Sequence, residues 1–128
     1  MQVTVLDIGQ GLSVVVKTAK HTLLYDAGPK YNEQSDAGGR IVVPYLRAEG
    51  IKELDGFIVS HDDIDHSGGA LTVLAQVPVG WFASSFTESG SMILPAHALK
   101  CFTGQHWQWD GVSFEVLYPS WQSYKIRV

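Results

Sequence analysis

A chain of 128 residues is long enough for one domain with its own core, and its 45% hydrophobic and 17% charged residues are ordinary for a globular protein. Its net charge of −4 argues against a free-standing nucleic-acid binder held by a basic patch, because phosphate affinity comes mainly from Lys and Arg. Cys101 is the only cysteine, which excludes an intrachain disulfide and a thiolate metal cluster. No apolar run has membrane-spanning length and the N-terminus is not signal-like, so we expect a soluble chain.

The first half of the chain predicts three strands and a helix. Apolar alternation indicates strands, joined as an antiparallel meander, at residues 3–6, 12–17 and 21–25. A polar loop through Ser35 follows. It leads into a helix at 38–49, whose middle Pro44 disturbs and which Gly50 ends.

The second half predicts alternating strands and helices. A buried strand at 55–60 is followed by a polar loop and a helix at 67–76, which together are a unit of an α/β fold. We expect the next strand at 80–84 and a short helix at 95–101. The chain then closes with a hairpin at 107–118 about an Asp-Gly turn.

The most informative stretch is the polar loop after the strand at 55–60. Five of its six residues from His61 to His66 can bind a metal or titrate. Three carboxylates between two imidazoles would repel one another unless a cation lies among them, so a divalent metal is the simplest explanation. The spacing of the candidate ligands can direct them to two neighbouring metal positions. They lie at every second position and the last two are adjacent: His61, Asp63, Asp65 and His66.

Two other interpretations compete with a paired-metal site. In a calcium-binding helix–loop–helix, the first, third, fifth and sixth positions would be Asp63, Asp65, Ser67 and Gly68. The twelfth position must carry a bidentate Glu, and here it is Leu74, which excludes calcium. The second interpretation is a solvated acidic loop with Ser67 capping the following helix, and the residues alone leave it open.

The sequence also resembles a known family. His-x-Asp-x-Asp-His at 61–66 is similar to the His-x-[His/Asp]-x-Asp-His signature of the metallo-β-lactamase fold. Several segments resemble, in order, the soluble domain of the ComEC family of competence DNA-uptake proteins: 5–11, 24–29, 44–47, 60–69 and 107–112. Leu12 departs from the Gly-Gln-Gly-Asp form of many relatives. The resemblance implies an αββα sandwich and a metal-dependent phosphodiesterase that acts on DNA during uptake and is attached to a membrane channel.

The resemblance further implies a role for each candidate residue. Two divalent ions, zinc or manganese, would be bound by His61 and Asp63 at the first position and by Asp65 and His66 at the second. Asp65 would also be the catalytic carboxylate. Asp63 replaces a histidine with a carboxylate, which is a hard oxygen ligand. The first position therefore favours manganese or magnesium more than zinc alone. Asp26 and Asp7 are expected to support the ligands as hydrogen-bond acceptors, with plain turn formation as the alternative for both.

Hydrolases of this fold complete the site with ligands from a second half of the domain. After His66 the only further His and Asp residues are His97, His106 and Asp110. We therefore expect residues 1–128 to be the N-terminal half of one such domain, with a site that holds few or no ions by itself.

The implied partners are DNA, the membrane-channel part of the same parent protein and a second copy of this chain. The parent is expected in the bacterial inner membrane, with this domain on the outer, periplasmic face. Two alternative functions stay open. One is a non-catalytic scaffold module of the channel, and the other is a different metallo-hydrolase of the same fold.

Overall fold

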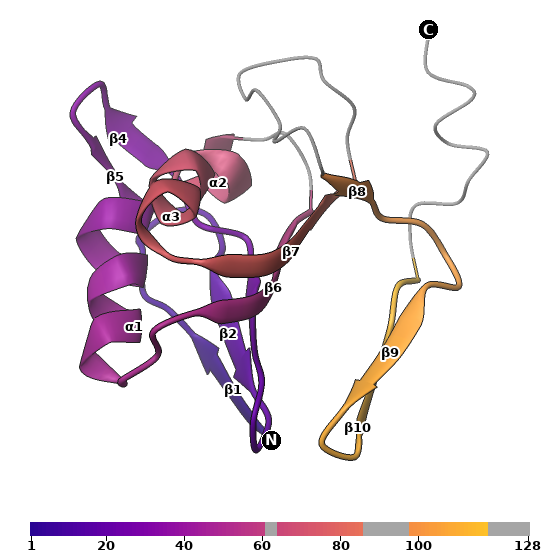
Figure 1. Cartoon of the computed structure of the whole chain (residues 1–128). Coiled ribbons are helices and arrows are strands. Elements are labelled where there is room, and N and C mark those ends of the chain that lie inside the picture. Colours follow the sequence, from indigo (N-terminus) through magenta and orange to yellow (C-terminus); the bar gives the residue numbers. More distant parts are fainter. Residues whose placement is uncertain (61–63, 86–97, 118–128) are drawn as a thin grey trace, which may run out of the picture.

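A mixed six-stranded sheet forms the centre of the computed structural model, which describes residues 1–60, 64–85 and 98–117 (Figure 1). The strand order is β1-β2-β3-β6-β7-β8. The first three strands are antiparallel, and β3, β6, β7 and β8 run parallel to one another. The strands are β1 (Gln2–Val5), β2 (Val14–Lys17), β3 (Thr22–Tyr25), β6 (Leu54–Val59), β7 (Val79–Ser84) and β8 (Leu99–Lys100).

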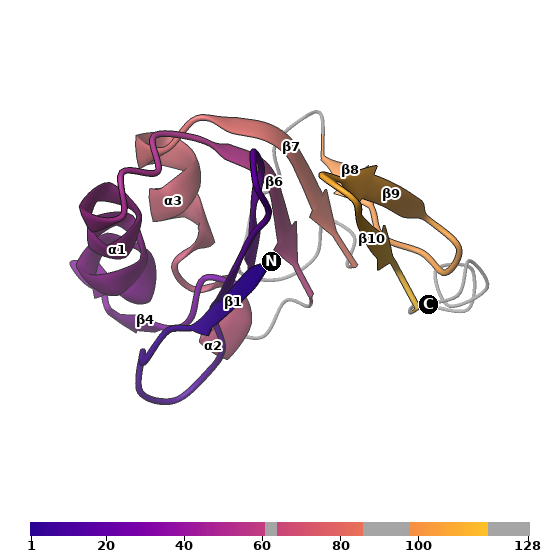
Figure 2. The ribbon, with the colours of Figure 1, turned by 90° about the horizontal axis from the view of Figure 1, so that it is seen from below.

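Helices cover one face of this sheet. They are the π-helix η1 (Gly38–Val42) and the α-helices α1 (Val43–Ala48), α2 (Ile64–Ser67) and α3 (Ala70–Gln76). Figure 2 shows α1 and α3 together on one side of the strands. The main core lies between them and the sheet and is built from buried side chains that include Leu24, Phe57, Phe82, Val43, Leu46 and Val73. None of the described helices is long and apolar enough to cross a membrane.

A hairpin covers part of the opposite face. Its strands are β9 (His106–Trp109) and β10 (Val112–Glu115), and Figure 2 shows it on the side of the sheet away from α1 and α3. Its aromatic rings pack on a smaller second core of Leu23, Ile58, Ala83 and Cys101. Trp81 of β7 joins this cluster because Gly56 of β6 has no side chain, and a Cβ there would lie 2.4 Å from the indole. The hairpin therefore adds a β layer to the helix-covered sheet.

The face of the sheet that carries the hairpin is more exposed to solvent over β1. Val3 and Val5 are 55% and 67% exposed. They pair with Val16 and Val14, whereas Thr4 between them pairs with the buried Val15 of the main core. Because strand side chains alternate between faces, both exposed valines lie on the hairpin side of the sheet.

The predicted helix at 38–49 is present in two parts. Val43 N–H donates to Gly38 C=O five residues back, which makes the first part a π-helix, and Pro44 lies in the first turn of α1. Proline has no N–H, so the α-type bond to Arg40 C=O cannot form. Gly50 ends the helix in the left-handed region at φ +72, as predicted.

Three other elements differ from the prediction. The polar loop through Ser35 contains a small hairpin of β4 (Lys30–Asn32) and β5 (Ser35–Asp36). The helix predicted at 67–76 is divided by Gly68 and Gly69, and Gly69 rather than Ser67 is the N-cap of α3. The short helix predicted at 95–101 is wrong at Leu99–Lys100, which form β8, while 95–97 lie outside the described residues. Backbone groups there bond to β7, including Cys101 N–H to Ser84 C=O at 2.8 Å, and this long-range pairing overrides local helix propensity.

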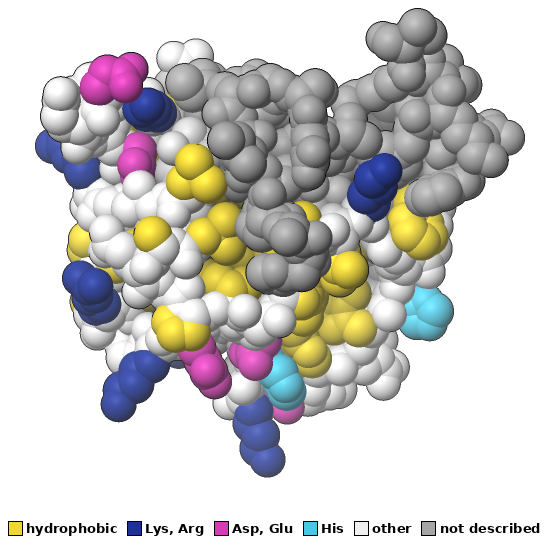
Figure 3. Space-filling view, turned by 45° about the horizontal axis from the view of Figure 1, so that its top comes forward, with side chains coloured by type: hydrophobic (Ala, Val, Ile, Leu, Met, Phe, Trp, Pro, Cys, Tyr) yellow, Lys and Arg dark blue, Asp and Glu magenta, His cyan; other side chains and the backbone are white. Residues whose placement is uncertain are grey.

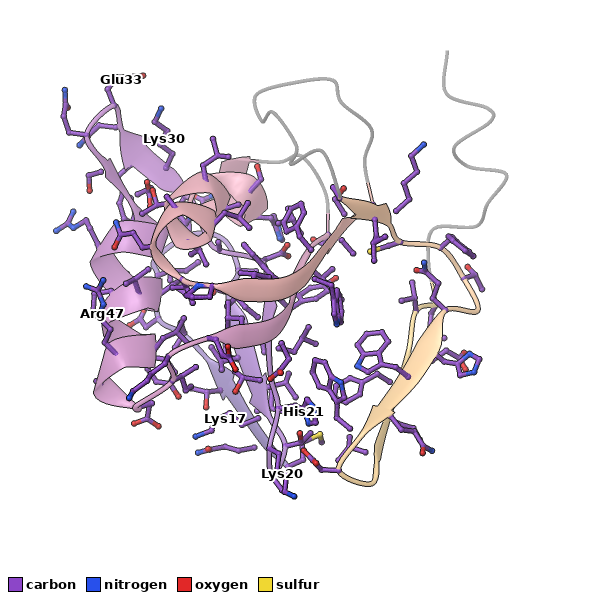
Figure 4. The ribbon with its side chains drawn as sticks, viewed as in Figure 1. Lys17, Lys20, His21, Lys30, Glu33 and Arg47 are labelled. Atoms are coloured by element: carbon purple, nitrogen blue, oxygen red, sulfur yellow. The ribbon has the colours of Figure 1, made fainter. Side chains whose placement is uncertain are left out.

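Asp110 fastens the hairpin turn to the turn between β2 and β3. Its Oδ2 atom accepts hydrogen bonds from Thr18 Oγ1 at 2.6 Å, His21 Nδ1 at 3.0 Å and Lys20 N at 2.7 Å. These bonds lower the pKa of Asp110 to about 2. The His21 ring also stacks on Trp109, with centroids 5.0 Å apart, and Figure 4 shows His21 beside the hairpin at this end of the sheet.

This pKa predicts a pH-dependent contribution of Asp110 to stability. A lowered pKa in the folded state stabilises the protein above the ordinary value of 3.8, and the contribution is lost as the pH falls towards about 2. Asp110→Asn retains a residue type that tolerates the left-handed backbone, at φ +52, but removes the charge. We expect wild type to be more stable than Asp110→Asn near neutral pH and the difference to shrink below about pH 4, measured by urea unfolding with tryptophan fluorescence.

Glu115→Gln, at an exposed position of the same hairpin, is the matched control and should show no such pH-dependent difference. A stability difference between wild type and Asp110→Asn that stays constant down to pH 2 would contradict this account of the anchor.

Candidate functional site

The predicted ligand loop begins where β6 leaves the sheet and ends in α2 (Figure 1). Residues 61–63, which include the predicted ligands His61 and Asp63, lie outside the described residues. Asp65 and His66 both lie in α2. Strand β3 runs parallel to β6, with Tyr25 paired with Ile58, so its C-terminal end lies beside the start of the loop.

Asp26 is fully buried and binds both ends of this loop. Its Oδ1 accepts a hydrogen bond from Ser60 N–H at 2.7 Å. Its Oδ2 accepts one from the Ser60 hydroxyl at 2.6 Å and lies 2.8 Å from His66 Nδ1. An ionised carboxylate can only accept, so Nδ1 of His66 carries the proton and the lone pair of the neutral ring is on Nε2. Carboxylates orient metal-binding imidazoles in this way.

The backbone around Asp26 is equally constrained. Asp26 has a left-handed conformation at φ +61, which is uncommon for residues other than glycine but is tolerated by aspartate. Its N–H donates to Ile58 C=O at 2.8 Å, and its C=O accepts from the Ser13 hydroxyl at 2.8 Å. Ala27 N–H donates to His66 C=O at 2.9 Å. Strained residues of this kind cluster at functional sites, which makes Asp26 a candidate for a functional role.

Glycines allow the segment after the loop to approach the rest of the chain closely. Gly69 N–H donates to Gly28 C=O at 3.1 Å. A Cβ on Gly69 would lie 2.4 Å from both Ala27 O and Gly38 N, and one on Gly38 would lie 2.2 Å from Gly69 O. The backbones at residues 27–28, 38 and 69 are therefore in direct contact.

Asp7 has the contacts of a turn former. It is exposed, and its Oδ1 accepts a hydrogen bond from Gly9 N–H at 3.4 Å. The Tyr31 hydroxyl donates to Ile8 C=O at 2.8 Å and holds the same turn. Support of a metal ligand by Asp7 stays a prediction.

Sequence reasoning missed Ser60, whose N–H and hydroxyl both donate to Asp26. Tyr25, the last residue of β3, is half-buried. Burial, and then the charge of Asp26, raise the pKa of Tyr25. Burial also raises the pKa of the neighbouring Cys101 to about 11. The available signal was a hydroxyl residue directly before the first predicted ligand.

The donor types present fit a divalent metal. The buried Asp26 carboxylate holds one imidazole by Nδ1, and the remaining predicted donors are one imidazole and two carboxylates, which zinc and manganese both accept. Within 1–60, 64–85 and 98–117, no group of three or more His, Cys, Asp or Glu residues could hold an ion. His61 and Asp63 lie outside the described residues, so the predicted ligand set stays a prediction.

Comparisons with known proteins place the chain in a family. Residues 6–89 match the model of the metallo-beta-lactamase superfamily. The chain belongs to this superfamily. It is 42% identical to Competence protein ComA of Neisseria gonorrhoeae, over 92% of this chain and 15% of that protein. It is 38% identical to Recombination protein 2 of Haemophilus influenzae, over 92% of this chain and 14% of that protein. The chain thus spans about one seventh of the length of these curated relatives.

A solved metallo-beta-lactamase shows the same fold. MEM-A1, a subclass B3 enzyme from a soil metagenome library, superposes with a TM-score of 0.68 at 14% identity, covering 91% of this chain and 49% of that chain. The predicted metallo-β-lactamase fold and the resemblance to the ComEC family are therefore confirmed. The chain corresponds to about half of a solved metallo-beta-lactamase chain.

The two adjacent glycines at the start of η1 give a matched test of the close approach beneath the loop. Gly38→Ala places a methyl group against the Gly69 carbonyl, which cannot move aside, and we expect a loss of about 1–3 kcal/mol in the free energy of unfolding. Gly39→Ala meets the Thr72 methyl at 3.3 Å and Asp36 Oδ1 at 3.8 Å, and it should cost less than about 1 kcal/mol. Urea unfolding measures both. Equal effects of the two substitutions would show that the approach is looser than described.

Asp26→Asn tests the carboxylate that joins the two ends of the loop. Asparagine has one acceptor oxygen and brings an NH2 group, so at least one of the three donors around Asp26 loses its partner. We expect a loss of about 2–3 kcal/mol in the free energy of unfolding. We also expect 15N NMR of the neutral His66 ring to change from the Nδ1-protonated tautomer to a mixture.

Asp36→Asn is the control, because Asp36 also accepts from a backbone N–H and a hydroxyl, those of Gly39 and Thr72, but is only half-buried. It should cost less and leave the His66 tautomer unchanged. An unchanged tautomer in Asp26→Asn would refute the role given to Asp26.

Proposed function

We propose that this chain supplies part of a metal-dependent phosphodiesterase that acts on DNA while a bacterial cell takes it up. The observation that carries the proposal is the buried Asp26 carboxylate bound to His66 and Ser60, on either side of a loop with metal-ligand spacing. The 42% identity to a competence protein supports DNA as the substrate. A pair of divalent ions would act as Lewis acids towards a phosphate diester and would activate the attacking water.

We assign the donors as the family resemblance implies. His61 and Asp63 would hold one ion, and Asp65 and His66 would hold the other, with Asp65 as the catalytic carboxylate. Asp26 keeps the Nδ1 proton of His66 in place, so that Nε2 is the atom presented to the ion.

We further propose that residues 1–128 are one half of the catalytic domain. The match to 49% of a solved metallo-beta-lactamase chain supports this proposal. The distribution of charge supports it as well. On the face shown in Figure 3, Lys and Arg side chains are scattered around the margin rather than gathered in one patch, and the net charge is −4. Attraction of DNA phosphates therefore requires positive charge from the other half or from the ions.

The remaining partners are those that the family resemblance implies. We propose that the parent protein lies in the bacterial inner membrane, that this domain is on its periplasmic face, and that it works beside the channel through which DNA enters. The exposed Val3 and Val5 on the hairpin side of the sheet favour association of the isolated chain with a second copy.

Metal-dependent nuclease assays on the parent protein test the proposal. With manganese or zinc we expect cleavage of DNA that falls by about 100-fold or more in Asp65→Asn. Asp62→Asn is the matched control, because Asp62 lies in the same loop but outside the ligand pattern, and it should stay within a few-fold of wild type.

The isolated chain provides the second arm of this experiment. We expect weak metal binding by calorimetry, no DNA cleavage, and a mass above that of a monomer by light scattering. Absence of cleavage by the parent protein with either metal would favour the scaffold function instead. Hydrolysis of lactams or thioesters without hydrolysis of DNA would favour another hydrolase of the same fold.

A further inference from the structure

We propose that Arg40 binds a phosphate of the nucleic-acid backbone beside the candidate site, and that Tyr31 holds the Arg40 guanidinium in place for this contact. The observation is a cation–π pair on the surface, in which Arg40 Cζ lies 5.5 Å from the centroid of the Tyr31 ring. The inference rests on the proposed function for the identity of the substrate, but the contact can be tested without metal and without cleavage.

Tyr31 is an exposed aromatic residue with a fixed orientation. It lies in β4 and is 40% exposed. Its hydroxyl donates to Ile8 C=O at 2.8 Å, so the far end of the ring is held by the turn that follows β1. An aromatic ring fixed in this way is a support on which a cation can stack. Tyr31 therefore gives the Arg40 guanidinium a defined position on the surface.

The charge of Arg40 is not used in an ion pair within the described part of the chain. None of the ion pairs among residues 1–60, 64–85 and 98–117 includes Arg40, which is exposed. Asp36, the nearest carboxylate in the sequence, accepts hydrogen bonds from Gly39 N–H and the Thr72 hydroxyl instead. Arg40 therefore retains N–H donors for a ligand.

The geometry of the pair favours an anion with two neighbouring oxygens. Stacking occupies one face of the planar guanidinium and leaves its edges, which carry five N–H donors. A phosphate diester has two non-bridging oxygens that can accept from two of these donors at once, which adds strength and geometric specificity. The adjacent Lys30 is instead paired with Glu33 at 3.5 Å. Arg40 is therefore the better candidate for a defined phosphate contact.

The fold places this pair beside the candidate site. Strand β4 contacts α2, the helix that contains His66, and Figure 1 shows the two side by side. Arg40 lies in η1, whose first residue is Gly38. A Cβ on Gly38 would lie 2.2 Å from Gly69 O, so η1 also approaches the segment that follows α2. A nucleic-acid strand with one phosphate at the site can therefore extend across Arg40.

The alternative is that Arg40 and Tyr31 only hold β4 against η1. Arg40→Gln removes the charge, and Arg40→Lys keeps the charge but removes the planar fork of donors. Arg47→Gln is the matched control, since Arg47 is an exposed arginine of α1, the helix that directly follows η1 (Figure 4). A purely structural role predicts no response of Arg40 to nucleic acid, and general electrostatic attraction predicts equal effects at Arg40 and Arg47.

The first measurement follows the Nε–H signals of Arg40 and Arg47 in residues 1–128 by 15N NMR. A short single-stranded oligodeoxynucleotide is added without metal, and we expect the Arg40 signal to shift while the Arg47 signal stays in place. Vesicles of anionic phospholipid are the second probe, because their head groups offer the same phosphate chemistry. An Arg40 signal that does not move with the oligonucleotide, or that moves only with the vesicles, overturns the proposal.

The second measurement is binding of the same oligonucleotide to the parent protein in EDTA at several salt concentrations. A phosphate contact to a single strand contributes about 0.7 to the slope of log K against log salt. We expect Arg40→Gln to weaken binding by about 10-fold and to lose this part of the slope, and Arg40→Lys to weaken binding but keep the slope. Equal losses in Arg40→Gln and Arg47→Gln contradict the proposal.

Cleavage by the parent protein with manganese is measured separately. Because the contact lies away from the reacting phosphate, Arg40→Gln should raise KM by about 10-fold and leave kcat within a few-fold of wild type. A loss in kcat with unchanged KM overturns the inference. A parent protein that binds the oligonucleotide through Arg40 but cleaves no nucleic acid refutes the proposed function and leaves the phosphate contact established.

Discussion

One buried carboxylate connects the sheet, the predicted ligand loop and the helix that follows it. Asp26 is excluded from water and has to be satisfied by donors from the protein, which come from Ser60 at the end of β6 and His66 in α2. The parallel pairing of β3 with β6 brings these donors together, and the left-handed turn at Asp26 directs its side chain between them. The stability of the fold and the orientation of Ser60 and His66 therefore depend on the same carboxylate.

The two faces of the sheet are organised differently. Helices α1 and α3 cover the first face with a continuous apolar core, whereas the second face carries a hairpin over its central strands and leaves Val3 and Val5 of β1 more exposed. The hairpin is attached at its turn through Asp110, at the end of the sheet away from the ligand loop (Figure 4). The two sides of the sheet therefore differ in how completely they are covered.

Local patterns predicted most of the strands and the place of the loop. The strand that leads to Ser60 and the hairpin about Asp110 were clear because apolar periodicity and turn residues agreed. The strand β8 could not be predicted in this way, because Leu99–Lys100 are extended only through bonds to β7. Asp26 could be proposed from its position after a strand, but its bonds to Ser60 and His66 join residues 34 and 40 positions apart. No local signal encodes such contacts.

The long sequence separation within the Asp26 cluster has a kinetic consequence. During synthesis, β3 emerges well before β6, and loop closure over this distance precedes any gain from the contacts. The Ser60 and His66 donors meet the carboxylate only when the parallel pair has formed. Before that, these donors are flexible and unoriented. Assembly of the strands therefore comes first, and the oriented Ser60 and His66 side chains come after it.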